Sequence, residues 1–180
     1  RQWKRQHKGH RAFSVVRHPV QRLHWAFARH ILVPGPECFS DIRETLRKHY
    51  GLPVPKDAPG PGHDAKKQRA AFVAFAKWVA GNLSGQTSQR VDAAWASQTE
   101  VLQGMAQVQL PDMVIREDQL PMGLAQLAEQ IGALSPDVPE WEDNAPVPLR
   151  DYYDDEVEAV VRAAYQRDYM MFGFRPWGAG

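Results

Sequence analysis

The chain has 180 residues, of which 43% are hydrophobic and 24% are charged, and its formal net charge is +1. This length and composition predict one globular domain, residues 1–180, with a sizeable core. The small net charge argues against a partner that is a nucleic-acid polymer, and the absence of any apolar run of eighteen residues predicts no transmembrane segment. The single cysteine, Cys38, excludes an internal disulfide and a cysteine-based metal site, and it fits a cytoplasmic protein.

Basic residues are concentrated at the start of the chain. Residues 1–30 contain no acid, and their lysines and arginines are Arg1, Lys4, Arg5, Lys8, Arg11, Arg17, Arg22 and Arg29. A local basic end of this kind suits a small polyanion better than a long one. The alternative is a solvated terminus, which is an equally good interpretation of residues 1–9.

The first elements in chain order are a strand and a helix. Residues 12–16 (AFSVV) are short, apolar and β-branched, which predicts a buried strand. Pro19 suits the first position of a helix, and apolar residues then follow at helical spacing. The pattern predicts strand, tight turn and helix across residues 12–31. Asp41 and Glu44 form a capping-box pattern for a short helix that ends near residue 50.

A proline- and glycine-rich loop over residues 51–63 separates this region from a long helix. Asp64 is its expected cap, and Gly85 follows its last turn. The apolar face of this helix consists of Phe72, Phe75, Ala76, Val79 and Leu83. Residues 86–100 are predicted to be a loop with a buried Trp95, and Trp78 is also expected in the core.

The second half contains another short strand and two helices. Residues 113–115 are apolar and predict a strand, and a helix is expected from Pro121 to about Gly132. Residues 135–149 include four prolines and predict a loop. The pattern over residues 151–169 predicts one continuous amphipathic helix.

Short apolar strands that alternate with helices predict an α/β fold, with a parallel sheet flanked by helices. Two strands are few for such a sheet, so we expect further strands upstream of Arg1. The junction at Arg17 is the best candidate site, because a helix start and an arginine at a strand end both favour an anion such as phosphate. The alternative is that Arg17 pairs with a carboxylate from the second half of the chain.

The segment VVRHPVQRLHWAF resembles the 3′-phosphate-binding motif of sulfotransferases that use 3′-phosphoadenosine 5′-phosphosulfate (PAPS), which has the form R-x-P-x-x-R-x-x-S-x-Y. Arg17, Pro19 and Arg22 match, and Phe27 stands at the aromatic position. Trp25 replaces the serine and cannot supply its hydroxyl. Either another donor serves, or the affinity for the 3′-phosphate is reduced.

Three later segments resemble the same family in the same order. AAWASQTEVL resembles its H-W-x-P-Q segment, DMVIREDQL resembles its strand followed by R-x-E-x-L, and residues 152–174 resemble its closing helix. The matching residues are Trp95, Gln98, Arg116, Glu117, Asp168, Phe172 and Gly173, while Ala94 and Phe174 depart from the pattern. The closest likeness is to the bacterial nodulation-type carbohydrate branch.

The resemblance implies a P-loop-like fold and sulfuryl transfer from PAPS to a hydroxyl of a carbohydrate or glycolipid, without a metal. It also implies that Arg17, Arg22 and Trp25 bind the co-substrate. The family's N-terminal strand and 5′-phosphosulfate loop have no match here, and we expect both to lie upstream of Arg1. The sequence indicates neither the identity of the acceptor nor the oligomeric state.

Two residues are candidates for the general base. Gly9-His10 resembles a family Gly-His pair that precedes the 3′-phosphate strand, and a histidine suits proton transfer near neutral pH. Glu117 lies just past a strand end, although pairing with Arg116 or Arg17 is an equally good interpretation of it. Two other functions stay open: a degenerate, non-catalytic member that binds a polyanion or a protein, and a nucleotide-dependent phosphotransferase.

Overall fold

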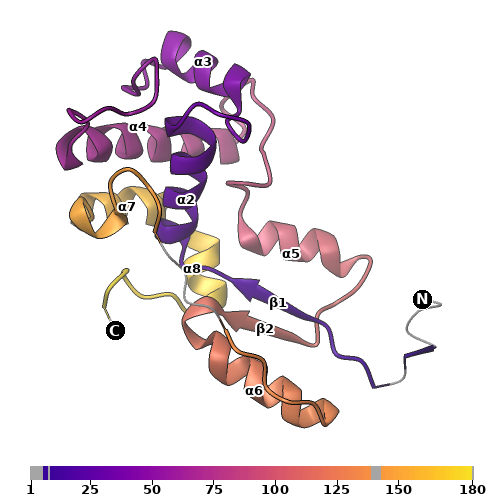
Figure 1. Ribbon diagram of the computed structural model, residues 1–180. Coiled ribbons are helices and arrows are strands. Elements are labelled where there is room, and N and C mark those ends of the chain that lie inside the picture. The colour runs from indigo at the N-terminus through magenta and orange to yellow at the C-terminus, as the bar shows by residue number, and fades with distance from the viewer. Residues whose placement is uncertain (1–5, 8, 139–142, 180) are drawn as a thin grey trace.

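The computed structural model describes residues 6–7, 9–138 and 143–179 and combines a small parallel sheet with helices on both sides (Figure 1). The strands are β1 (Phe13–Val16) and β2 (Met113–Arg116). The helices are α2 (Pro19–Phe27) with a π-helical continuation (Ala28–Leu32), α3 (Ser40–His49), α4 (Ala65–Leu83), α5 (Gln98–Ala106), α6 (Leu120–Ile131), α7 (Asp155–Ala164) and α8 (Gln166–Phe172). Single 3-10 turns cover Glu117–Gln119 and Leu149–Asp151.

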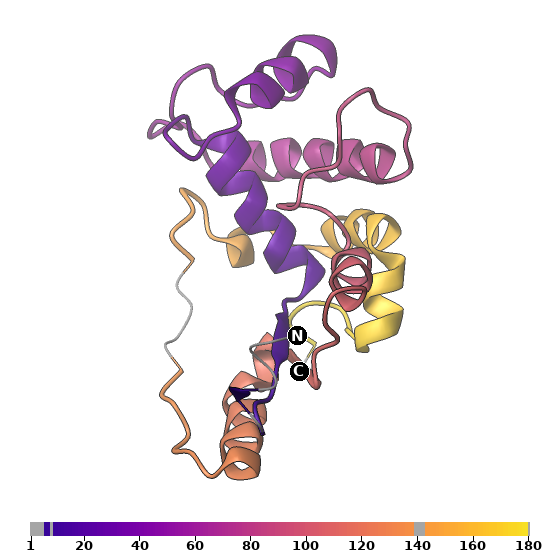
Figure 2. The same ribbon diagram turned by 90° about the vertical axis from the view of Figure 1, so that its right-hand side faces the viewer.

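The two strands pair in parallel, which confirms the α/β prediction. The register places Val16 opposite Arg116, so Arg17 and Glu117 leave the same carboxyl edge of the sheet. Ligands of open parallel sheets bind at this edge. In Figure 2, α2 runs from this end of β1 into the layer formed by α3 and α4.

The hydrophobic core lies where α2 meets α4 and α7. Phe27 of α2 is fully buried, and its ring lies 5.4 Å from the ring of Phe75 in α4. Trp95 is 0% exposed and also packs against Phe75. Trp78 is buried beside them, so the prediction that Trp78 and Trp95 belong to the core is confirmed. This core anchors α2, and therefore the strand end that precedes it.

Two predicted helix ends are confirmed by their caps. The side chain of Asp64 accepts a hydrogen bond from the N–H of Lys67, and α4 begins at the next residue. Gly132 ends α6 with a φ of 67°, a left-handed conformation that favours glycine. Such caps satisfy backbone groups that a helix leaves unpaired at its ends.

The start of α3 differs from the capping-box prediction. The helix begins at Ser40, and Asp41 lies in its first turn and does not cap it. Phe39 stands at the cap position, where its ring stacks on His30 at 4.3 Å and its N–H donates to the carbonyl of His30. Tertiary packing of this aromatic residue therefore overrides the local polar signal.

The final helix is shorter than predicted and is interrupted. The helix α7 begins at Asp155, after the cap Asp154, and a break at Tyr165 separates it from α8. The hydroxyl of Tyr165 donates to the carbonyl of Trp95. The structure also contains α5, which begins inside the predicted loop over residues 86–100.

Candidate functional site

A hollow of about 590 Å³ lies at the carboxyl edge of the sheet, where β1 gives way to α2. We call it the edge hollow, and its lining residues are Val15, Arg17, Arg22, Trp25, Ala93, Ala94, Gln98 and Glu117. It brings together four of the five site residues that the sequence predicted. These four come from two segments separated by about half of the chain, and the parallel pairing of β1 with β2 makes them neighbours.

Arg17 and Glu117 form a bidentate ion pair across the two strand ends. The Nε of Arg17 donates to Oε2 of Glu117 at 2.6 Å, and Nη2 donates to Oε1. Both side chains are about a quarter exposed. The pairing of Arg17 with a carboxylate from the second half of the chain, which the sequence left as an alternative, is therefore present. An anion that enters the edge hollow must share the guanidinium of Arg17 with Glu117, or displace Glu117 from it.

The backbone of Arg17 is held by the side chain of Gln98. The N–H of Arg17 donates to Oε1 of Gln98 at 2.9 Å, and Nε2 of Gln98 donates to the carbonyl of Arg17 at 2.8 Å. This two-point contact fixes the end of β1 at the residue where the chain turns into α2. Gln98 thus positions the backbone from which the Arg17 side chain extends, a role that the sequence motif alone did not reveal.

Gln98 is in turn held by Asp168 of α8. The Asp168 carboxylate is 0% exposed and accepts hydrogen bonds from the N–H groups of Gln98 and Thr99, both at 2.9 Å. It also accepts from the hydroxyls of Ser97 and Thr99, both at 2.7 Å. Asp168 therefore caps the N-terminus of α5 from another helix, in the manner of an N-cap carboxylate. The closing helix is linked through Gln98 to the strand end at Arg17.

Arg22 joins α2 to the segment that precedes α5. Its two terminal nitrogens donate to the carbonyls of Ala96 at 2.6 Å and Ala93 at 2.7 Å. Burial lowers the pKa of Arg22 from its ordinary value, but an arginine keeps its charge at neutral pH. A guanidinium has five N–H donors, so Arg22 can hold this segment and still donate to an anion in the edge hollow.

The start of α2 offers fewer backbone donors than the sequence suggested. The Nδ1 atom of His18 accepts from the N–H of Val20 at 3.2 Å, and its Nε2 donates to the carbonyl of Arg175 at 2.8 Å. Pro19 has no N–H, and the N–H of Arg17 is bound to Gln98. The donors available to an anion are therefore mainly the side chains of the edge hollow.

Trp25 forms part of the wall of the edge hollow, two turns along α2 from the strand end. The guanidinium of Arg29 lies over its ring, 5.1 Å from the centroid, and the edge of His30 packs against it at 5.3 Å. Its indole N–H is a donor only, so it cannot reproduce a serine hydroxyl. A role for Trp25 in binding a co-substrate stays a prediction.

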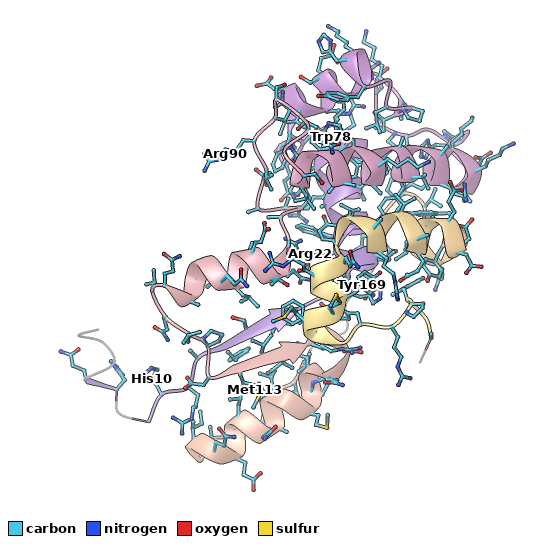
Figure 3. All side chains as sticks on the ribbon, turned by 180° about the vertical axis from the view of Figure 1, so that it is seen from behind. His10, Arg22, Trp78, Arg90, Met113 and Tyr169 are labelled. Atoms are coloured by element: carbon cyan, nitrogen blue, oxygen red, sulfur yellow. The ribbon has the colours of Figure 1, made fainter. Side chains whose placement is uncertain are left out.

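The structure does not bring His10 to this site. Figure 3 shows His10 beyond the amino end of β1, whereas Arg22 lies beyond the carboxyl end. The His10 ring contacts the carbonyl of His7 at 3.0 Å. Of the two candidate bases, only Glu117 lies in the edge hollow.

Within residues 6–7, 9–138 and 143–179, no group of three or more His, Cys, Asp or Glu side chains is arranged to hold a metal ion. Among the helices of the same residues, none is long and apolar enough to span a bilayer.

Comparison with known proteins gives one match. The family model described as "Sulfotransferase family" matches residues 1–175, which is nearly the whole chain. No curated protein and no solved structure matches the chain.

Proposed function

Because this chain belongs to the sulfotransferase family, we propose that it transfers a sulfuryl group from PAPS to a hydroxyl of a carbohydrate or glycolipid. The observation that carries the proposal is the edge hollow, where Arg17 and Arg22 converge at the carboxyl ends of two parallel strands. We assign the 3′-phosphate of the co-substrate to this hollow. Its two cations and one carboxylate leave a net positive charge for a dianionic phosphate group.

Arg17 is oriented in advance for such a group. Its backbone is fixed by Gln98, and its guanidinium already presents a bidentate pair of donors to the carboxylate of Glu117. A phosphate accepts the same fork geometry and carries more charge than a carboxylate. We therefore propose that the 3′-phosphate displaces Glu117 from Arg17, while Arg22 donates to it from α2.

This exchange gives Glu117 a second role. Displacement of Glu117 from Arg17 would leave its carboxylate without the guanidinium partner that it has in this structure. The freed carboxylate then accepts the proton of the acceptor hydroxyl, whose oxygen attacks the sulfur of PAPS. The bond between sulfur and the bridging phosphate oxygen breaks, and adenosine 3′,5′-bisphosphate leaves. Most of the rate enhancement in such transfers comes from positioning and charge stabilisation.

A second candidate function follows from the same ion pair. If Glu117 keeps Arg17 when nucleotide is present, the chain is a non-catalytic member of the family that binds another anion or a protein. Trp25 at the position of the family serine, and Ala94 at that of the histidine, are the departures that favour this alternative.

Calorimetric titration with adenosine 3′,5′-bisphosphate tests the proposal, with 5′-ADP as the control ligand. We expect tight binding that requires the 3′-phosphate and no added metal. Arg17→Ala should weaken it by roughly 2–4 kcal/mol, the scale for removing one partner of a buried charged contact. The matched control is Lys48→Ala, an exposed cation of α3 that lies outside the edge hollow. Equal affinity for both nucleotides would contradict the assignment of the 3′-phosphate.

A further inference from the structure

A second hollow, of about 610 Å³, shares Trp25 with the edge hollow. We call it the loop hollow, because two loops line it: residues 33–38, after the π-helical continuation of α2, and residues 143–146, before the 3-10 turn at Leu149. Its helical side consists of His24 and Trp25 of α2, and of Ala28 and Arg29 of the π-helical continuation. A ligand in this hollow would therefore lie beside the proposed 3′-phosphate site.

The wall of the loop hollow is built on a buried polar network. His24 is 0% exposed, and its Nε2 donates to Oδ1 of Asp143 at 3.0 Å. Its Nδ1 accepts from the hydroxyl of Tyr152 at 2.6 Å. Burial lowers the pKa of His24, although Asp143 opposes this effect, so the ring is neutral near pH 7.

Asp143 orders the loop that it belongs to. Its carboxylate accepts from the N–H of Ala145 at 3.2 Å and from the N–H of Leu149 at 2.9 Å. Burial alone would raise the pKa of Asp143, but these N–H groups and His24 hold it below its ordinary value. Asp143 is therefore ionised near neutral pH, and its network fixes the shape of the loop hollow.

The charge of the loop hollow is opposite to that of the edge hollow. Arg29 is paired with Glu37, so among the described residues that line this hollow the carboxylate of Asp143, beside a neutral His24, is the charge without a cationic partner. Of the described residues, two carboxylates and one arginine thus line this hollow, whereas two arginines and one carboxylate line the other. Like charges at close range disfavour an anionic ligand in the loop hollow.

The remaining lining combines apolar rings with hydrogen-bonding groups. The rings belong to Trp25, Pro34, Pro36 and Pro146, and the side chain of Asn144 adds an amide that can both donate and accept. Saccharides present the complementary surface, with C–H faces that pack on rings and hydroxyls that donate to carboxylates. The volume is within the range of specific small-molecule sites.

We propose that the loop hollow binds part of the saccharide acceptor, and that it selects uncharged or amine-bearing saccharides over acidic ones. This inference rests on the proposed function, because a saccharide acceptor is part of that function. The two hollows then separate the substrates by charge: the phosphate occupies the positive hollow and the saccharide occupies the negative one. Trp25 contacts both ligands.

The test compares three tetrasaccharides of equal length with the full chain: neutral cellotetraose, an amine-bearing glucosamine tetramer, and a carboxylate-bearing galacturonate tetramer. Binding is followed by ligand-observed NMR at low salt, with and without adenosine 3′,5′-bisphosphate. We expect the neutral and amine-bearing tetramers to bind at least about fivefold more tightly than the galacturonate tetramer, the scale of one favourable ionic contact.

Two substitutions connect this preference to the loop hollow. Glu37→Gln removes an exposed carboxylate and should reduce the preference severalfold, and Asp143→Asn should act in the same direction. Because Asp143 also orders its loop, Glu37→Gln keeps the test valid if the Asp143 variant fails to fold. The matched control is Glu129→Gln, which removes an exposed carboxylate of α6 outside both hollows.

The outcomes separate this inference from the proposed function. Loss of bisphosphate binding would count against the proposed function itself. Bisphosphate binding without saccharide binding would overturn the inference alone, as would equal binding of all three tetramers or a preference that Glu37→Gln leaves unchanged.

Discussion

The buried carboxylate of Asp168 is expected to contribute strongly to the stability of the folded protein. Asp168→Ala removes a single acceptor that serves four donors at the start of α5. A hydrogen bond to a charged group contributes about 1.5–3 kcal/mol, and a buried donor left without a partner costs about 1–3 kcal/mol. The relief of a buried charge offsets part of this loss. We therefore expect a destabilisation of about 3–5 kcal/mol, the range for breaking a buried charged contact.

Asp168→Asn provides a graded version of the same change. The three donors at Oδ1 can keep their acceptor, while the new amide group would face the N–H of Gln98, which donates to Oδ2 of the native carboxylate. Loss of one charged hydrogen bond predicts about 2 kcal/mol, which is less than the alanine effect. The amide should also disturb Gln98, so binding of adenosine 3′,5′-bisphosphate should weaken even in folded protein.

Urea denaturation measures the stability change, and calorimetry measures nucleotide binding. A change in the denaturation midpoint at constant m-value reports stability, and about 4 kcal/mol corresponds to a lower melting temperature by roughly 8–16 °C in a chain of this size. Glu129→Gln, an exposed change in α6, should alter neither quantity. An Asp168→Ala protein within about 1 kcal/mol of the parent would refute the reasoning, because a capping carboxylate with four buried partners cannot be neutral to folding.

Two further predictions concern packing and pH. Gly123→Ala should destabilise the folded protein by about 1–3 kcal/mol, because the new Cβ would lie 2.7 Å from Cγ2 of the buried Ile115. Urea denaturation should show a smaller loss of stability when the same substitution is made in an Ile115→Ala background. His24 and His18 both have pKa values below 6.5 because of burial, so the unfolded chain binds more protons and stability should fall as the pH drops below about 6.5. Melting temperatures from about pH 7.5 to 5.5 should therefore fall less for His24→Gln than for the parent, and an unchanged slope would show that His24 does not titrate in this way.

The sequence predicted the parts of the fold that have local signals. Apolar β-branched runs identified both strands, and Asp64 and Gly132 marked helix ends through caps that depend on nearby residues. The helix α5 has little such signal, since few of its side chains are buried and its cap comes from Asp168, about seventy residues later in the chain. The break at Tyr165 likewise coincides with a distant contact, to the carbonyl of Trp95.

The candidate site was also predicted only in part, because some of its residues have local sequence signals and others depend on distant contacts. Arg17 and Arg22 stand at recognisable positions beside a strand end, and Glu117 follows the other strand, so a parallel register brings them to one edge. The sequence could not show that Gln98 clamps the backbone of Arg17, because that contact depends on how α5 is docked. His10 precedes the predicted strand and Arg17 follows it, so the order of the sequence already indicated that the length of β1 separates the two residues.

The central claim is that the 3′-phosphate of the nucleotide displaces the carboxylate of Glu117 from the guanidinium of Arg17. The most direct measurement is the affinity of Glu117→Gln for adenosine 3′,5′-bisphosphate, compared with the parent chain and with 5′-ADP. We expect tighter binding of the bisphosphate by about 1 kcal/mol or more, because the competing carboxylate is gone, and little change for 5′-ADP. Unchanged or weaker binding of the bisphosphate would contradict the claim, since Glu117 would then not compete with the ligand for Arg17.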